Sequence, residues 1–323
     1  MVLPLVMLAI FVTAARHVPR AIAPIACVLA LIELNIVTWR YNPSSSAGDV
    51  YPLTGAIQAM QHLVREPSRM TALGWSFLPE TPSYYGLEDI KTNNPLEDRR
   101  ANRMIRGYLH ASDDYDEVFH DTSEPFFDYL NIRYLYIPPD ERWSDPRFVL
   151  RYADRDGRVF ENTRVLPRYF VVRQFRVHPE FGHVLAMTKS IRDFSVEAVA
   201  THIPSQVMER APQLARSGLS APGTVRVMRY EPNRTVLHVE HSGWSLLVSS
   251  EVDMPGWRAY WNAHREPTVT VNGAFLGCFI PPGPGTLQLL YRPDAFIHGV
   301  RISLAALIVL LITAGVAGIR HGS

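Results

Sequence analysis

The sequence predicts a membrane protein of the α+β class, with about three transmembrane helices, an exported α/β layer and a small antiparallel β-sandwich. Three observations predict this class. Apolar runs lie at both ends of the chain, over residues 2–15, 21–39 and 302–319. Residues 41–222 alternate between helix-like and strand-like patterns. Residues 223–294 contain only short strand-like segments, separated by turn residues.

The second and third apolar runs are long enough to cross a bilayer, whose hydrocarbon core takes about 20 apolar residues. The first run is short, and a secretory signal peptide is its alternative interpretation. No Lys or Arg precedes it, however, and another apolar run follows closely, which favours a helical hairpin over residues 1–40.

Positive charge in the short loops predicts the orientation of these helices. Arg16 and Arg20 lie in the hairpin turn, and Arg320 follows the last apolar run. Loops rich in Lys and Arg stay in the cytoplasm, so we expect a multi-pass protein of the cell membrane with residues 41–300 outside. Arg40 and Arg301 oppose this orientation weakly, because long translocated segments are largely exempt from the rule.

The exported segment begins with a short amphipathic helix before Pro67 and continues with a strand over 69–75 and a helix over 95–109. A short helix then precedes a strand over 132–138. From residue 147 we expect a hairpin with its turn at Asp156-Gly157. One strand over 168–177, a helix near 181–190 and a strand near 195–203 follow, and then a polar Pro/Ser/Gly stretch over 204–223.

The remaining strands are short and regularly spaced, which is typical of a sandwich or barrel. They are expected over 224–230, 234–241, 244–252, 257–261, 268–272, 275–281 and 285–291. The predicted domains are therefore a transmembrane hairpin (1–40), an extracytoplasmic α/β domain (41–222), a β-sandwich (223–294) and a C-terminal transmembrane helix (295–323).

The composition excludes some partners. Lys+Arg number 32 and Asp+Glu 31, so no basic surface for nucleic acid is indicated. Two cysteines, Cys27 and Cys278, cannot form a disulfide framework, and both are expected to be unpaired buried thiols.

Several stretches resemble the C-terminal extracytoplasmic part of YfhO-like bacterial membrane proteins, which are of the GT-C glycosyltransferase type. They are "YYGLEDI" (84–90), "DYLNIRYLYIP" (128–138), "LPRYFVV" (166–172) and the segment from "SLLVSSEVDMPGWRAYWNA" to "LQLLYRP" (245–293), followed by an apolar helix. The chain departs from the family at Asn262-Ala263, where Asp-Gly is usual, and at "DIKTNN" (89–94).

The resemblance implies a lipid bilayer around the helices and a glycan or lipid-linked sugar as ligand. The resemblance also implies that the catalytic acid of the family lies in an outward-facing loop near the N-terminus. No such loop is recognisable in this chain. A catalytic half, such as an upstream polytopic membrane subunit, would then be needed for transfer. A divalent cation is implied only in combination with that half, and the cofactor is otherwise unknown.

Aromatic residues near the Pro255-Gly256 turn are the first candidate binding residues. Trp257, Tyr260 and Trp261 could stack on a sugar, and Trp244 lies nearby. Strand alternation, however, places Trp257 and Trp261 on one face and Tyr260 on the other, which favours tryptophans that fill the sandwich core.

Two further candidates are acidic. Asp113, Asp114 and Asp116 belong to the cluster "HASDDYDEVFHD" (110–121), which suits a divalent cation but matches no calcium or zinc spacing, so a solvated loop is the preferred interpretation. Glu33 interrupts the second apolar run. It is either a functional group within the membrane or a residue that reaches the interface.

Two functions follow from the sequence. The first is a membrane-anchored module that positions a glycan acceptor or lipid-linked sugar for a catalytic half located elsewhere. The second is a non-enzymatic envelope scaffold that binds a polysaccharide or a protein partner. An adjacent gene for a polytopic subunit with an outward acidic loop would favour the first.

Overall fold

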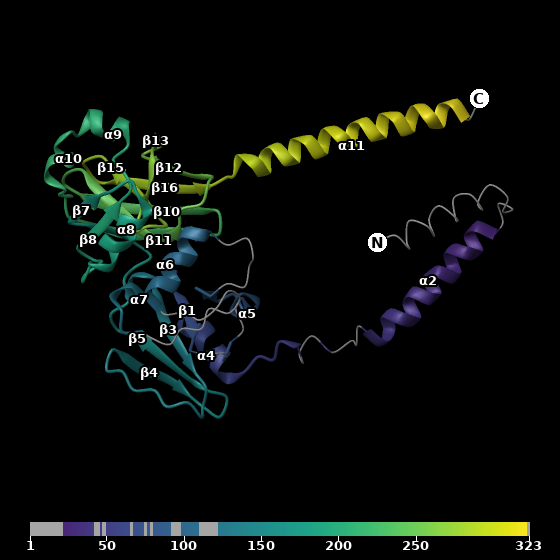
Figure 1. Ribbon diagram of the computed structural model, residues 1–323, viewed down its shortest axis with the longest axis horizontal. Coiled ribbons are helices and arrows are strands. Elements are labelled where there is room, and N and C mark those ends of the chain that lie inside the picture. The colour runs from purple at the N-terminus through teal and green to yellow at the C-terminus, as the bar shows by residue number, and fades with distance from the viewer. Residues whose placement is uncertain are drawn as a thin grey trace. The chain divides into compact units, whose positions relative to one another are not determined.

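The computed structural model describes residues 22–41, 46, 50–64, 67–73, 76–77, 80–91, 98–109 and 122–321. The chain divides into two compact units, residues 1–53 and 54–323. In the first unit, α2 (Ile22–Tyr41) covers the second predicted apolar run (Figure 1). The first run and the turn at residues 16–20 lie outside the described residues.

The first sheet of the second unit has five strands and mixed direction. Its order is β2-β1-β3-β5-β4, with β1 parallel to both β2 and β3. The strands are β1 (Arg69–Ala72), β2 (Glu88–Asp89), β3 (Ile132–Ile137), β4 (Phe148–Ala153) and β5 (Arg158–Asn162). The β4–β5 hairpin confirms the predicted turn. Asp154 Oδ1 accepts the N–H groups of Asp156 and Gly157 at 2.8 and 3.0 Å.

Helix α4 (Gly55–Leu63) begins where the sequence predicts an amphipathic helix. Thr54 caps it by accepting the N–H of Ile57 at 3.4 Å, and Ala56, Ile57 and Met60 are buried against the first sheet. Helix α6 (Arg99–Leu109) confirms the later part of the helix predicted over 95–109, and residues 95–97 lie outside the described residues. Its first turn is capped by Asp98, whose Oδ1 accepts two backbone N–H groups.

The other short helices are α5 (Thr81–Tyr84), α7 (Pro125–Tyr129), α8 (Phe181–Lys189), α9 (Ser205–Arg210) and α10 (Gln213–Ser217). Helices α9 and α10 lie in the stretch predicted to be irregular. Each directly follows a proline, Pro204 or Pro212, at its N-cap. Prolines are typical of loops, and the sequence therefore predicts an irregular stretch. In the structure each proline instead precedes the first turn of a helix, where the N–H that proline lacks would have no hydrogen-bond partner within the helix.

A six-stranded sheet lies at the centre of the second unit, in the order β6-β11-β15-β14-β8-β7. Its strands are β6 (Tyr169–Val172), β7 (Gln174–Val177), β8 (Glu197–Ala200), β11 (Ser245–Val252), β14 (Thr268–Val271) and β15 (Phe275–Ile280). The single strand predicted over 168–177 is wrong. The chain breaks at Arg173, so β6 and β7 lie at opposite edges of the sheet.

The third sheet has five antiparallel strands in the order β13-β12-β16-β10-β9. They are β9 (Gly223–Glu231), β10 (Arg234–His241), β12 (Trp257–Trp261), β13 (His264–Glu266) and β16 (Gly285–Tyr291). This sheet packs on the six-stranded one, so the predicted sandwich is present. The six-stranded sheet contains strands from both sides of residue 222. The boundary predicted there therefore crosses a sheet and separates no independent domains.

The central sheet is buried on both faces. Along β6, Tyr169 and Val171 face the core shared with the third sheet, whereas Phe170 and Val172 face the core shared with the first sheet and its helices. The core shared with the first sheet is rich in aromatic side chains, among them the fully buried Tyr129. The second unit is thus layered, and its central sheet separates the two cores.

Helix α11 (Asp294–His321) follows β16 directly. Within the described residues, its segment Asp294–Ile312 is the one helix that is long and apolar enough to cross a membrane, judged by length and composition. None of that 19-residue segment is buried in the protein. Ile302, for example, is 69% exposed.

Candidate functional site

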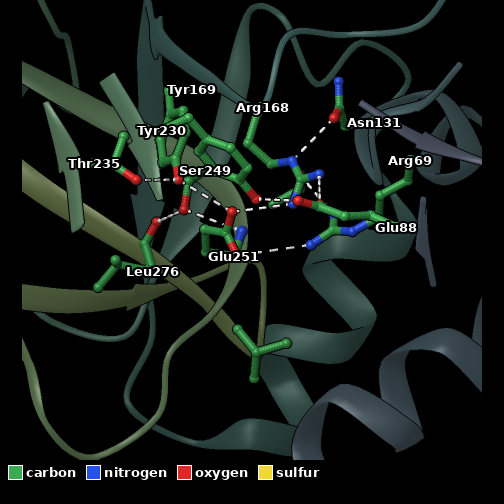
Figure 2. Close-up of polar contacts among 12 residues, drawn as sticks. Arg69, Glu88, Asn131, Arg168, Tyr169, Tyr230, Thr235, Ser249, Glu251 and Leu276 are labelled. Carbon is green, nitrogen blue, oxygen red and sulfur yellow. Dashed lines mark hydrogen bonds and ion pairs between the residues drawn. The ribbon is translucent and has the colours of Figure 1, made fainter. Parts of the chain in front are cut away.

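A network of buried and half-buried charges joins the first sheet to the central sheet (Figure 2). Arg168, which immediately precedes β6, has a side chain only 1% exposed. Its guanidinium lies 3.0 Å from Glu251 Oε1 and donates a short hydrogen bond to Glu88. Its Nε donates to Asn131 Oδ1 at 3.0 Å. The three partners come from β11, from β2 and from the turn before β3.

A second arginine completes the pairing. Arg69, the first residue of β1, places Nη2 at 3.8 Å from Glu251 Oε2. Its Nη1 donates to the Leu130 carbonyl at 2.8 Å and to Ser250 Oγ at 3.0 Å. Two arginines therefore face two glutamates, and the four formal charges cancel.

Two tyrosines close the network on the side of the third sheet. The Tyr169 hydroxyl lies 3.1 Å from both Glu251 Oε1 and Thr235 Oγ1. The Tyr230 hydroxyl donates to Glu88 Oε1 at 2.7 Å, and its ring lies 5.6 Å from the Arg168 guanidinium carbon. The network thus reaches all three sheets and fixes their relative position.

The pKa values reflect this mutual compensation. Burial alone would raise the pKa of Glu251, but the adjacent Arg168 and Arg69 hold it below its ordinary value. Burial, and then the neighbouring Arg168, lower the pKa of Arg69. Burial also raises the pKa of the Tyr169 and Tyr230 hydroxyls, so both remain protonated donors.

A cleft of about 460 Å³ lies over this network. Arg168, Tyr169 and Tyr230 belong to both the network and the cleft lining. One wall is β9, and the other contains Arg133 together with residues from the loop before β6. This volume falls in the range of small-molecule sites. The cleft is the candidate ligand site of the described residues.

The "MPGW" stretch has a separate structural role, as the joint between the sandwich and α11. The Gly256 carbonyl accepts the N–H of Arg292 at 2.9 Å. Arg258 pairs with Asp294, the first residue of α11, at 2.5 Å. Gly256 has φ +123°, and a Cβ there would lie 2.8 Å from Pro293. The turn therefore requires glycine both for its backbone conformation and for its contact with the helix start.

The aromatic candidates lie mainly in the packing of the sandwich. Trp261 is 5% exposed and belongs to the core between the two sandwich sheets. Trp257 is half-buried against that core, and its Nε1 donates to the Val252 carbonyl at 3.1 Å. Tyr260 is half-buried, on the opposite face of β12. Trp244 packs on the other core beneath the Arg210 guanidinium. These rings form no shared stacking surface.

Of the acidic candidates, only Glu33 lies among the described residues. Glu33 is exposed on α2. Asp113, Asp114 and Asp116 lie outside the described residues. Within the part of the chain that the structure describes, no three His, Cys, Asp or Glu side chains are grouped to hold a metal ion. Cys278 is free and buried, and burial raises the pKa of its thiol. The side chain of Cys27 is outside the described set.

The charged network was missed by the sequence interpretation. Arg69, Glu88, Arg168 and Glu251 come from separate segments of the chain, and no motif connects them. The available signal was the charge at an apolar strand position, as at Glu251 after "SLLVSS". A buried charge requires a partner, but the sequence does not identify which one.

Comparisons with protein-family models, with curated proteins and with solved structures find no match to this chain.

Proposed function

We propose that this chain is a membrane-anchored extracytoplasmic module that positions a glycan acceptor or a lipid-linked sugar. The catalytic half of the transferase would belong to another polypeptide, such as an upstream polytopic subunit. The support for this proposal is the resemblance to YfhO-like proteins in the sequence, together with two features of the fold.

The observation that carries the proposal is the exposed apolar helix α11. Its segment Asp294–Ile312 makes no buried contact with the rest of the protein. Such a surface is costly in water and is satisfied in a bilayer. Because Gly256 and Arg258 fix the start of the helix to the sandwich, a bilayer around α11 would hold the sandwich near its surface.

The finer arrangement has three spans. We propose that α2 and the apolar run before it form a hairpin, with its turn and the C-terminus in the cytoplasm. Exposed apolar side chains on α2, such as Ile36, suit the same environment as those of α11. The sandwich and the cleft then lie outside the cytoplasm.

The cleft over the charged network provides the position for a ligand. Its walls come from separate sheets, and the network beneath it holds those sheets rigidly together. A site on a rigid base can present a bound group to a second protein in a fixed orientation.

Cysteine labelling of intact cells tests the topology. Single cysteines at Ser45 and Ser323 are introduced into a chain carrying Cys27→Ser and Cys278→Ala. An impermeant maleimide should modify the Ser45 variant only, with the Ser323 variant reacting after permeabilisation. Labelling at Ser323 alone in intact cells would contradict the proposed orientation.

Incubation of the purified full chain with lipid-linked sugars tests whether the catalytic half belongs to another polypeptide. We expect the sugar lipid to be retained without transfer to an acceptor. Transfer by the chain alone that is abolished by Asp114→Asn would contradict the proposal and identify the acidic cluster as catalytic. Retention of envelope polysaccharide without any lipid-linked sugar would favour the alternative function, a non-enzymatic scaffold.

A further inference from the structure

Helix α6 has an exposed face that carries arginines. Its apolar side packs into the core through Met104 and Ile105, which are both buried. In a helix with about 3.6 residues per turn, Arg99 and Arg103 point away from that side, and both are exposed. Neither arginine has an ion pair or a side-chain hydrogen bond among the described residues. The exposed face of α6 therefore carries two positive charges that no described acid balances.

Helix α6 is held beside the joint between the sandwich and α11. Arg100, which flanks the exposed face, donates from Nη2 to the Asp253 carbonyl at 2.9 Å. Asp253 directly precedes the "MPGW" stretch, and the Gly256 carbonyl within that stretch accepts the N–H of Arg292. Arg292 in turn lies two residues before α11. The arginines of α6 are therefore close to the start of the membrane helix.

Two further arginines belong to the joint itself. Arg292 precedes α11 and Arg301 lies in its second turn, and both are exposed without an ion pair among the described residues. The neighbouring acids are already engaged. Asp98 and Asp294 pair with other arginines at 3.6 and 2.5 Å, and the half-buried Asp253 accepts a threonine hydroxyl. The joint and the exposed face of α6 thus form one cationic cluster.

The sequence of α11 indicates how far this cluster lies from the bilayer. Arg301 is the last charged residue before the uncharged run 302–319. A long arginine side chain near the end of a span reaches the headgroups, so the hydrocarbon boundary lies close to Arg301. Asp294 is then about 10 Å further out, at about 1.5 Å of rise per residue. The headgroup region of one leaflet is about 5–8 Å thick, which places the joint at the surface of the headgroups.

We propose that Arg99, Arg103, Arg292 and Arg301 form a binding face for the phosphate groups of anionic phospholipids around α11. This inference rests on the membrane anchoring proposed above and adds the class of lipid that the anchored end selects. Guanidinium groups donate paired hydrogen bonds to phosphate oxygens, and a cluster of arginines attracts anionic headgroups within a Debye length of about 8–10 Å.

This binding face has a consequence for the orientation of the protein. A single helix leaves the attached sandwich free to rotate and tilt above the bilayer. The arginines of α6 provide a second contact with the headgroups, at a distance from the helix axis. Two contacts restrict rotation and tilt, so the cleft keeps a constant orientation toward the membrane surface.

The lipid composition around the full chain tests the proposal. The chain is reconstituted in vesicles of phosphatidylcholine with a minor fraction of phosphatidylglycerol and is isolated with its surrounding lipids in polymer-bounded discs. We expect phosphatidylglycerol to be enriched about twofold or more over the vesicle, because each arginine near the surface favours anionic lipid. Arg99→Glu combined with Arg103→Glu should remove about half of this enrichment or more.

The matched control changes the same number of charges elsewhere. Arg142, in the loop before β4, and Arg216, in α10, are exposed arginines outside the cluster. Arg142→Glu combined with Arg216→Glu should keep the enrichment of the wild type. An equal loss in the two double variants would contradict the proposal, because net charge rather than the face of α6 would then determine the lipid. Circular dichroism verifies that each variant is folded.

Extraction of the same vesicles with alkaline carbonate separates this inference from the anchoring on which it rests. The wild type and both double variants should remain in the membrane fraction, because α11 is unchanged in all three. Release of the wild type would overturn the anchoring and this inference together. A wild type that stays in the membrane without enrichment of phosphatidylglycerol would overturn this inference alone, and an acidic protein partner would then be the better occupant of the arginine face.

Discussion

Arginines occupy two different regions around the same cleft. At its base, Arg168 and Arg69 are buried and paired with Glu251, which in turn is bonded to Tyr169. At its rim, Arg226 is exposed and without an ion pair among the described residues. The residue type is the same, but the arginines at the base are paired with carboxylates and Arg226 is not.

This difference indicates which arginines the fold depends on. A buried arginine has lost its hydration and depends on its carboxylate partners, so its removal is costly. An exposed arginine keeps its hydration, and its removal hardly affects folding. The paired arginines at the base therefore stabilise the fold, whereas Arg226 at the rim contributes little to its stability.

The largest expected effect is at the base. Arg168→Met leaves Glu251 buried with half of its compensation and leaves Glu88 without its arginine. Loss of one partner from a buried pair costs roughly 3–5 kcal/mol in the free energy of unfolding. Urea unfolding of the full chain in detergent, followed by tryptophan fluorescence, measures this free energy. A midpoint equal to that of the wild type would remove the distinction between base and rim. Arg168→Met combined with Glu251→Gln should recover part of the loss.

Tryptophans on β12 extend the comparison to apolar side chains. Trp261 is almost completely buried, whereas Trp257 and Tyr260 are half-buried. Trp261→Ala should cost roughly 3 kcal/mol through lost burial and a cavity, and Tyr260→Ala clearly less. Trp257→Ala should fall between them, since its ring covers the core and also contacts Tyr291. Urea unfolding gives all three values. If Tyr260→Ala is the most damaging, the core does not lie where the structure places it.

Two buried acids sharpen the comparison through their pH dependence. The arginines hold the pKa of Glu251 below its ordinary value, so its stabilisation is present at neutral pH. This stabilisation is lost progressively as the pH falls from the ordinary glutamate pKa of about 4.3 through the lower pKa that Glu251 has in the native state. Asp89 behaves oppositely. Burial raises the pKa of Asp89 to about 6, although the nearby Lys91 opposes this rise.

An acid with a raised native pKa destabilises the fold when it is ionised, so stability should increase as the pH falls from about 6 toward 4. Thermal unfolding of the full chain from pH 3 to pH 8 should therefore pass through a maximum between these limits. Asp89→Asn should remove the rise on the neutral side and leave the acid loss in place. A rise that persists in Asp89→Asn would show that another group is responsible.

Much of the fold is predictable because it depends on local patterns. The hairpin at Asp156-Gly157 and the strands of the sandwich follow from turn residues and apolar runs. The break at Arg173 was not predictable, because the residues on either side of it are equally strand-like and only their partners differ. Pairing between distant strands is a tertiary property that a local pattern does not contain.

The candidate site is predictable to a smaller extent. The "MPGW" stretch stands out in the sequence, and its residues do have particular roles, but at the joint with α11 and in the sandwich core. The cleft depends on Arg133 and Arg226, which are separated by a long segment and belong to different sheets. In a chain whose basic residues are nearly all arginine, no local feature distinguishes these two from the others.

The most direct test of the difference between base and rim is the thermal unfolding midpoint of Arg226→Ala, compared with those of Arg168→Met and the wild type. We predict that Arg226→Ala unfolds within about one degree of the wild type, as surface substitutions usually do. Arg168→Met should unfold at a clearly lower temperature, because it removes a buried partner of Glu251. An Arg226→Ala variant that is destabilised as strongly as Arg168→Met would contradict the account.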